Sequence, residues 1–132
     1  MGVRPSQIPV AYEPWGRTTH VGTFEGGKFM GFAFYLELCQ QSPVAVLHEF
    51  DAAGTHTRSN VWPTPTAAEA ERKLEEEVSR LPGSERKSIA VRLFKVQLLG
   101  RTFGMVGRGD GGVEYVPYDL LFHDPWDGTY DT

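Results

Sequence analysis

The chain has 132 residues, of which 40% are hydrophobic and 12% aromatic, a composition typical of one globular domain. Its formal net charge of −4 gives no general attraction to nucleic acid or to an anionic membrane, so we expect neither as a partner. The single cysteine, Cys39, excludes an internal disulfide, and no apolar run is long enough for a membrane span or a secretory signal, so the sequence predicts a cytoplasmic protein.

The first part of the chain predicts an extended arm followed by a β-hairpin. Residues 1–17 are rich in proline and polar groups and predict the arm. Residues 19–24 and 28–38 have the pattern of strands, and the Glu-Gly-Gly between them suits a tight turn. Both faces of 28–38 carry apolar or small side chains, so we expect this strand to be central and covered on both sides.

A second hairpin is predicted for residues 44–50 and 55–62, which are joined by the turn sequence Asp-Ala-Ala-Gly. In the simplest register of this hairpin Glu49 faces His56, and a carboxylate beside a histidine can orient a general base. Such a pair is also a common surface ion pair that contributes little to stability. Both interpretations remain open from the sequence.

One helix is predicted over residues 66–81. Thr66 and Glu69 have the spacing of a capping box, and Pro82-Gly83 ends the pattern. The apolar residues of this segment recur at steps of three or four and form one stripe: Ala67, Ala70, Leu74, Val78 and Leu81.

The rest of the chain predicts more strands. Residues 88–100 and 101–109 form a third hairpin, residues 113–118 a short strand that Pro117 limits, and residues 119–122 a turn or short helix. Because one helix stands between runs of strands joined by short turns, we predict an α+β fold. It is a single domain over residues 1–132, in which a mainly antiparallel sheet of six or seven strands carries the helix on one face.

The last ten residues, 123–132, have three interpretations: a clasp packed on the body, a frayed tail or an acidic metal site. The clasp is favoured because Asp-Pro and Asp-Gly form turns while Trp126 and Tyr130 can dock on the sheet. We therefore expect no bound metal and no cofactor. The side chains that a metal site would use are His123, Asp124, Asp127 and Asp131.

Two sequence motifs and the lone thiol predict structure rather than chemistry. Residues 22–28 match most of a phosphate loop, but Phe29 stands where a magnesium-binding Ser or Thr is required, and a strand follows instead of a helix. Arg108-Gly-Asp110 spells an integrin-binding tripeptide within a sequence that suits a hairpin tip. Cys39 has no base near it in the sequence, so we interpret it as a structural thiol.

Two functions from different classes follow. In the first, the protein is a non-catalytic module that binds another protein, or a second copy of itself, in a regulatory, accessory or neutralising role such as that of an immunity protein. Its aromatic side chains would then anchor a partner or seal the core; these are Trp15, Trp62, Tyr118, Trp126 and Tyr130. The alternative is a small enzyme or ligand-binding domain. Its site would lie on an open sheet face around Tyr35, His48, Glu49 and His56.

Three stretches resemble a group of small actinobacterial proteins that carry the label "formate hydrogenlyase regulatory protein". They are IPVAYEPWGRTTHVGTF, AVLHEFDAAGTHTRSNVW and PWDGTYDT. The resemblance covers most of the chain and involves turns and aromatic anchors. It implies a cytosolic bacterial protein with a non-catalytic regulatory or accessory role, and it assigns no functional residue.

Overall fold

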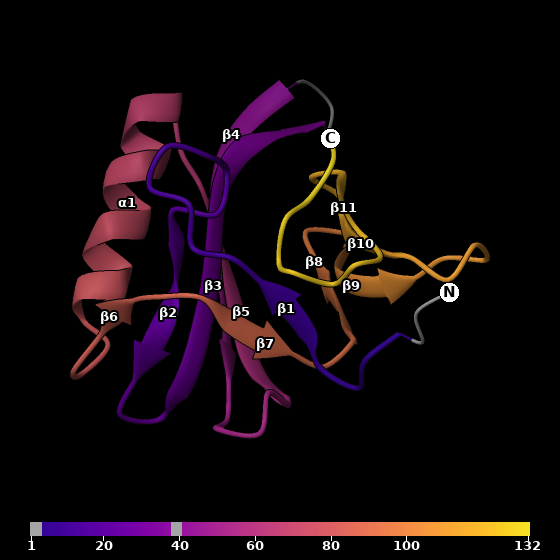
Figure 1. Cartoon of the computed structure of the whole chain (residues 1–132). Coiled ribbons are helices and arrows are strands. Elements are labelled where there is room, and N and C mark those ends of the chain that lie inside the picture. The colour runs from indigo at the N-terminus through magenta and orange to yellow at the C-terminus, as the bar shows by residue number, and fades with distance from the viewer. Residues whose placement is uncertain (1–3, 38–40) are drawn as a thin grey trace.

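The computed structural model describes residues 4–37 and 41–132, which form strands around one helix (Figure 1). The elements, in chain order, are β1 (Ile8–Val10), β2 (His20–Phe24), β3 (Gly27–Glu37), β4 (Gln41–Phe50), β5 (His56–Pro63), α1 (Ala67–Ser79), β6 (Glu85–Arg86), β7 (Ile89–Val91), β8 (Phe94–Leu98), β9 (Arg101–Gly107), β10 (Val113–Val116) and β11 (Leu120–Phe122).

The fold is α+β and antiparallel, as predicted, but the strands form three sheets instead of one sheet of six or seven strands. A five-stranded sheet has the order β5-β4-β3-β2-β6, and a four-stranded sheet has the order β11-β10-β9-β8. The third sheet is the pair β1-β7. Figure 1 shows the resulting layers, with α1 against one face of the five-stranded sheet and the four-stranded sheet beyond its other face.

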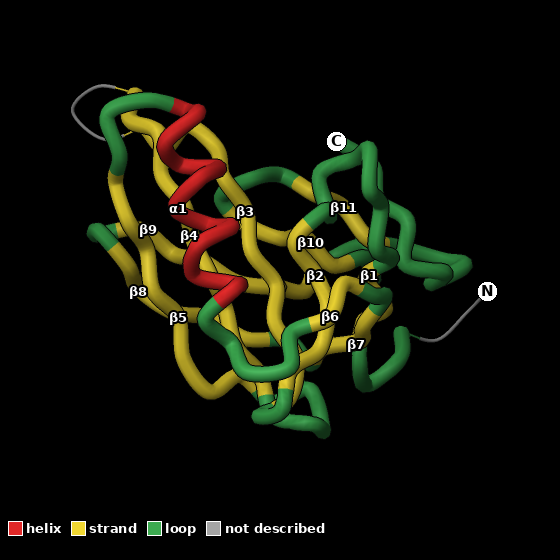
Figure 2. The backbone as a smooth tube through the Cα atoms, turned by 90° about the vertical axis from the view of Figure 1, so that its left-hand side faces the viewer, coloured by secondary structure: helices red, strands yellow, loops and turns green. Residues whose placement is uncertain are grey.

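The helix forms where its capping signal predicts and covers one sheet face (Figure 2). The Thr66 hydroxyl accepts a hydrogen bond from the Glu69 backbone N–H at 3.1 Å, which satisfies one of the free donors of the first turn. The apolar stripe then packs on the sheet. This core layer consists of Ala70, Leu74 and Val78 from the helix and Phe29, Ala45 and Leu47 from the sheet.

The larger core lies between the five-stranded and four-stranded sheets. Alternate residues of β3 face it, as the period of a strand requires, and Phe32 reaches the Tyr115 ring of β10 with 4.4 Å between ring centroids. Strand β3 is therefore central and covered on both sides, as predicted. Because the second cover is a sheet, the face that the sequence analysis expected to be open is buried.

Three other expectations need correction. The predicted arm contains β1, which pairs with β7. The run 88–100 is two strands, because β7 pairs with β1 while β8 pairs with β9, so the chain changes partners between them. Residues 119–122 contain strand β11, which pairs with β10, where a turn or helix was expected.

The C-terminal residues 123–132 lie against the body of the protein. Asp131 exchanges two backbone hydrogen bonds of 2.8 Å with Leu121, and the Gly128 carbonyl accepts one of 2.9 Å from Ala11. Trp126 and Tyr130 pack against the core between the sheets. These contacts match the clasp interpretation and tie the end of the chain to its first strand region.

Candidate functional site

His48 lies in the core between the two large sheets and is completely buried (0% exposed). Its Nε2 is 2.7 Å from the Tyr115 hydroxyl and its Nδ1 is 2.6 Å from the Ser59 hydroxyl. Burial, with a smaller contribution from nearby His56, lowers the pKa of His48 from 6.5 to about 3. The imidazole is therefore neutral near pH 7.

The same hydrogen-bond chain continues to His56, whose Nε2 lies 2.6 Å from the Ser59 hydroxyl. Burial of the Tyr115 hydroxyl raises its pKa well above 10.0, so this group keeps its proton and forms a neutral hydrogen bond with His48 Nε2. The Ser59 hydroxyl, which can donate one hydrogen bond and accept another, bridges His48 Nδ1 and His56 Nε2. This polar chain links β10 of one sheet to β4 and β5 of the other.

His56 lies at the outer end of this chain, and its ring stacks on Phe94 with 4.7 Å between centroids. Partial burial lowers the pKa of His56 as well. Chemically, the chain satisfies every nitrogen that the two rings place in the core. These hydrogen bonds connect one sheet to the other. The innermost residue, His48, has no exposed surface that a substrate could contact.

The structure does not bring Tyr35 and Glu49 to these histidines. Both side chains lie on the helix-facing side of the five-stranded sheet, since they alternate with residues of the inter-sheet core. Glu49 is opposite Arg58 and forms an ion pair of 3.3 Å with it, so the predicted Glu49–His56 pairing is wrong. There are two causes: the hairpin closes with Phe50 opposite His56, and a bulge after Glu49 then makes Thr57 an extra residue on β5.

A second histidine cluster, which the sequence analysis missed, lies between β2 and α1. The nearly buried His20 contacts Glu71 Oε2 through Nε2 at 3.2 Å, and its Nδ1 lies 3.3 Å from Glu75 Oε1. Arg86 Nη2 lies 3.1 Å from the same Nδ1 and 2.9 Å from Glu75. The available signal was the spacing of Glu71 and Glu75, which places two carboxylates on one helix face.

The predicted aromatic anchors differ in exposure. Trp126 and Tyr130 pack on the core, and Trp62 is partly buried with the Lys73 ammonium 5.4 Å from the centre of its ring system. Tyr118 is half-buried. Trp15, by contrast, is 98% exposed.

Arg17 brings three of these aromatics to the same end of the molecule. Tyr118 stacks on Phe34 at 4.7 Å between centroids, and the Arg17 guanidinium lies 4.9 Å from the centre of the Tyr118 ring. The Arg17 backbone N–H donates to the Tyr130 hydroxyl at 2.6 Å, and Trp15 is two residues earlier in the chain. We call the end of the molecule that carries Trp15, Phe34, Tyr35, Tyr118 and Tyr130 the aromatic end.

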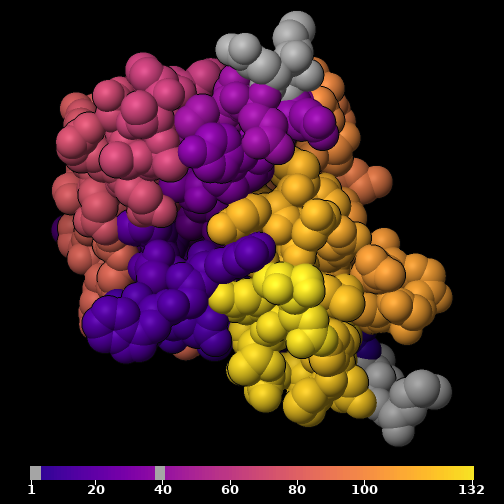
Figure 3. Space-filling view, turned by 90° about the horizontal axis from the view of Figure 1, so that it is seen from above, coloured from indigo at the N-terminus to yellow at the C-terminus, as the bar shows by residue number. Residues whose placement is uncertain are grey.

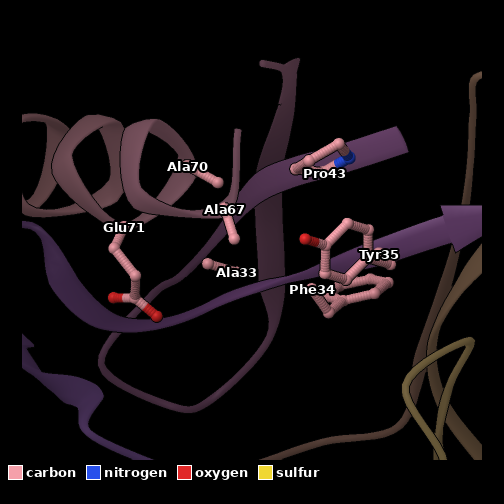
Figure 4. Close-up of a pocket in the computed structure, with 7 residues that line it drawn as sticks. All are labelled: Ala33, Phe34, Tyr35, Pro43, Ala67, Ala70 and Glu71. Atoms are coloured by element: carbon pink, nitrogen blue, oxygen red, sulfur yellow. The ribbon is translucent and has the colours of Figure 1, made fainter. Parts of the chain in front are cut away.

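Figure 3 looks down on this end of the molecule. The N-terminal segment in indigo, the ends of β3 and β4 in purple, the helix in pink and the C-terminal residues in yellow all reach this face. A pocket of about 110 Å³ opens here between α1, β3 and β4 (Figure 4). Its lining consists of Ala33, Phe34, Tyr35, Pro43, Ala67, Ala70 and Glu71.

The sequence motifs are hairpin turns in the structure. Residues 22–28 run from β2 through a turn into β3, as predicted. Arg108 pairs with Asp110 at 3.5 Å and with Glu114 at 3.1 Å, so the charged ends of this tripeptide bind groups of their own hairpin. Cys39 lies outside the described residues.

In the tail, His123 forms an ion pair with Asp131 at 2.6 Å, and the hydrogen bond to that carboxylate is the main reason why the pKa of His123 is raised. Among residues 4–37 and 41–132, no group of three or more His, Cys, Asp or Glu side chains is arranged to hold a metal ion.

Comparisons with protein-family models, with curated proteins and with solved structures found no match for this chain. Within the part of the chain that the structure describes, no helix has the length and apolarity needed to cross a membrane.

Proposed function

We propose that this chain is a protein-binding module with a regulatory or accessory role in the cytoplasm, and that its partner binds the aromatic end. The observation that carries the proposal is the 98% exposure of Trp15. Tryptophan is among the residues most enriched at the energetic centres of protein interfaces. A solvated indole gains most from a partner that buries it.

The loop that carries Trp15 is held in place by hydrogen bonds on both sides of the indole. The Gly16 backbone N–H donates to the Glu13 carbonyl at 3.2 Å, and the Arg17 N–H donates to the Tyr130 hydroxyl at 2.6 Å. A loop that is already ordered loses less conformational entropy when it binds. The Trp15 indole is therefore held in its exposed position before a partner binds.

The rest of the aromatic end supplies further contact area. Tyr35 is 57% exposed, and the half-buried Tyr118 has a ring that is already stacked on Phe34. The net charge of −4 favours a basic partner through electrostatic complementarity. Neutralisation of a basic toxic protein is one role that such a surface would suit.

The test compares Trp15→Ala with Leu93→Ala, since Leu93 is another exposed apolar residue (40%) that precedes β8, away from the aromatic end. The partner is first captured from native cells and identified by mass spectrometry, and its Kd is then measured with the purified protein. We expect Trp15→Ala to raise the Kd by about 30-fold or more, which corresponds to the loss of about 2 kcal/mol at an interface anchor.

Leu93→Ala should leave the Kd unchanged, and urea unfolding should show that both variants stay within about 0.5 kcal/mol of the wild type, as surface substitutions do. Equal Kd values for wild type and Trp15→Ala would contradict the proposal. Light scattering of the purified chain distinguishes a foreign partner from a second copy, because self-association that Trp15→Ala abolishes would make the partner this chain itself.

A further inference from the structure

The pocket at the aromatic end exists because the first turn of the helix has only small side chains facing the sheet. Near its middle and end, Leu74 and Val78 fill the space above the sheet. At its start the residues that face the strands are Ala67 and Ala70, whose side chains end at Cβ, and β3 contributes Ala33. Small side chains on both layers leave about 110 Å³ between them.

Two polar groups lie at opposite ends of this apolar space. Figure 4 shows the Tyr35 hydroxyl directed from β3 toward the alanines and the Glu71 side chain at the other end, on the helix. The walls between them are the methyl groups of alanine and the ring of Pro43. A ligand that fits must therefore have an apolar stem and a polar head.

The Glu71 carboxylate is positioned from behind by the His20 cluster. The Glu71 carboxylate can only accept, so His20 Nε2–H donates to Glu71 Oε2 at 3.2 Å. One carboxylate oxygen is thus held by the protein, and Oε1, which makes no hydrogen bond within the described residues, is left to accept a bond from a ligand.

This arrangement selects the charge and the shape of the ligand head. An anion would be repelled by Glu71, and an apolar group would desolvate the carboxylate without compensation. A guanidinium binds a carboxylate best through both oxygens, and one of these is already engaged by His20. A compact ammonium needs only one oxygen, and the carbon stem that carries it can lie along the apolar walls.

We infer that this pocket binds the alkylammonium side chain of a lysine on the protein partner. The inference rests on the proposed function and deepens it, because it names the chemistry through which the partner is recognised. The four-carbon stem of lysine lies along the alanine and proline walls, and the ammonium donates to Glu71 Oε1. Trp15 and the pocket then belong to one interface, as anchor and charge contact.

The test uses capped tripeptides and the isotope-labelled protein, with binding followed by amide NMR shifts. The probe is acetyl-Gly-Lys-Gly-amide, and its matched control contains norleucine, which keeps the stem and lacks the charge. We expect the lysine peptide to shift the amides of the pocket residues and the norleucine peptide to bind about tenfold more weakly or not at all. Similar binding of the two peptides would overturn the inference.

Two variants show whether the pocket itself is responsible. Glu71→Gln should raise the Kd of the lysine peptide about tenfold. Ala67→Leu should also weaken binding, because it fills the space while keeping the charge. Glu76→Gln is the matched control, since it removes the same charge from the same helix beside Lys73 and Arg80. If Glu76→Gln weakens binding as much as Glu71→Gln, general acidity explains the effect and the inference is wrong.

A free amine and the partner itself complete the test. n-Butylammonium should bind more weakly than the peptide; equal or tighter binding would show that the pocket takes a small amine and would contradict a protein-borne lysine. Loss of partner binding with Trp15→Ala but not with Glu71→Gln would refute the lysine pocket and leave the proposed function standing. Loss with neither variant would refute both.

Discussion

His48 contributes a feature of this protein that depends on pH. Histidine in an unfolded chain has a pKa near 6.5, whereas His48 in the fold has a pKa of about 3. Below pH 6.5, His48 is therefore protonated in the unfolded state but stays neutral in the folded state. The free energy of unfolding decreases as the pH falls, because protonation stabilises only the unfolded state. The cause is the dry space between the sheets, where a charged imidazole would have no counter-charge in its hydrogen-bond chain.

We predict that the free energy of unfolding decreases by up to about 1.4 kcal/mol per pH unit between about pH 6 and pH 4 through His48 alone. Urea unfolding over this pH range measures it. The control is His48→Gln, which keeps a side chain that can accept from Tyr115 and does not titrate. The wild-type protein should lose stability with a steeper slope than this variant; parallel curves would contradict the assigned burial of His48.

At the same scale, the aromatic residues show what a sequence can and cannot reveal. Trp15, Trp126 and Tyr130 all occur in irregular, turn-rich sequence, and nothing in their neighbours distinguishes the exposed indole from the two packed rings. Exposure is decided by which distant segment covers a side chain. Trp126 and Tyr130 are covered because the tail pairs with Leu121, whereas Trp15 is on a loop that turns outward.

Among the elements, the helix has the clearest local cause. Thr66 is the N-cap residue, and its hydroxyl satisfies a backbone donor that would otherwise be free. Thr66→Ala should therefore lower the free energy of unfolding by about 1 kcal/mol, as typical cap deletions do. Urea unfolding measures the loss, and Thr66→Ser, which restores a hydroxyl at the same place, should recover most of it. An equal loss in both variants would assign the effect to packing instead of capping.

Elements with local causes could be predicted from the sequence, and elements that depend on distant pairing could not. The hairpins β2-β3, β4-β5 and β8-β9 have turn residues between alternating runs, and all three form. The run 88–100 gave no sign of its division, because that division depends on the pairing of β7 with β1 at the other end of the chain. The three residues of β11 are too few for a periodic pattern.

The predicted site at Glu49 and His56 is wrong for a related reason. The interpretation of Glu49 and His56 as neighbours assumed that the hairpin closes one residue earlier, but Phe50 lies opposite His56, and the extra residue Thr57 then places Arg58 opposite Glu49. A bulge of this kind has no reliable signature in one sequence. The pocket at the aromatic end was equally invisible, because its lining comes from two strands and a helix that only the fold brings together.

Across the whole molecule, the two large sheets share one core, and this has a consequence for unfolding. The inner face of the five-stranded sheet packs on Phe103, Met105 and Tyr115 of the four-stranded sheet. Neither sheet can unfold or separate without exposing the apolar face of the other sheet to water. The hydrogen-bond chain from Tyr115 to His56 crosses the same boundary and would lose its buried partners at the same moment.

We therefore predict that the chain unfolds in one cooperative transition. Two variants report on opposite sides of the molecule: one keeps only Trp62, beside the helix, and the other keeps only Trp126, in the tail, with the remaining tryptophans replaced by phenylalanine. Their fluorescence midpoints in urea, each compared with circular dichroism of the same variant, should coincide within error. If Trp126 fluorescence changes at a lower urea concentration than the helix signal, the four-stranded sheet and the tail open separately. The shared core would then be too weak to couple the layers, and the aromatic end, which draws residues from both, would not persist as one surface.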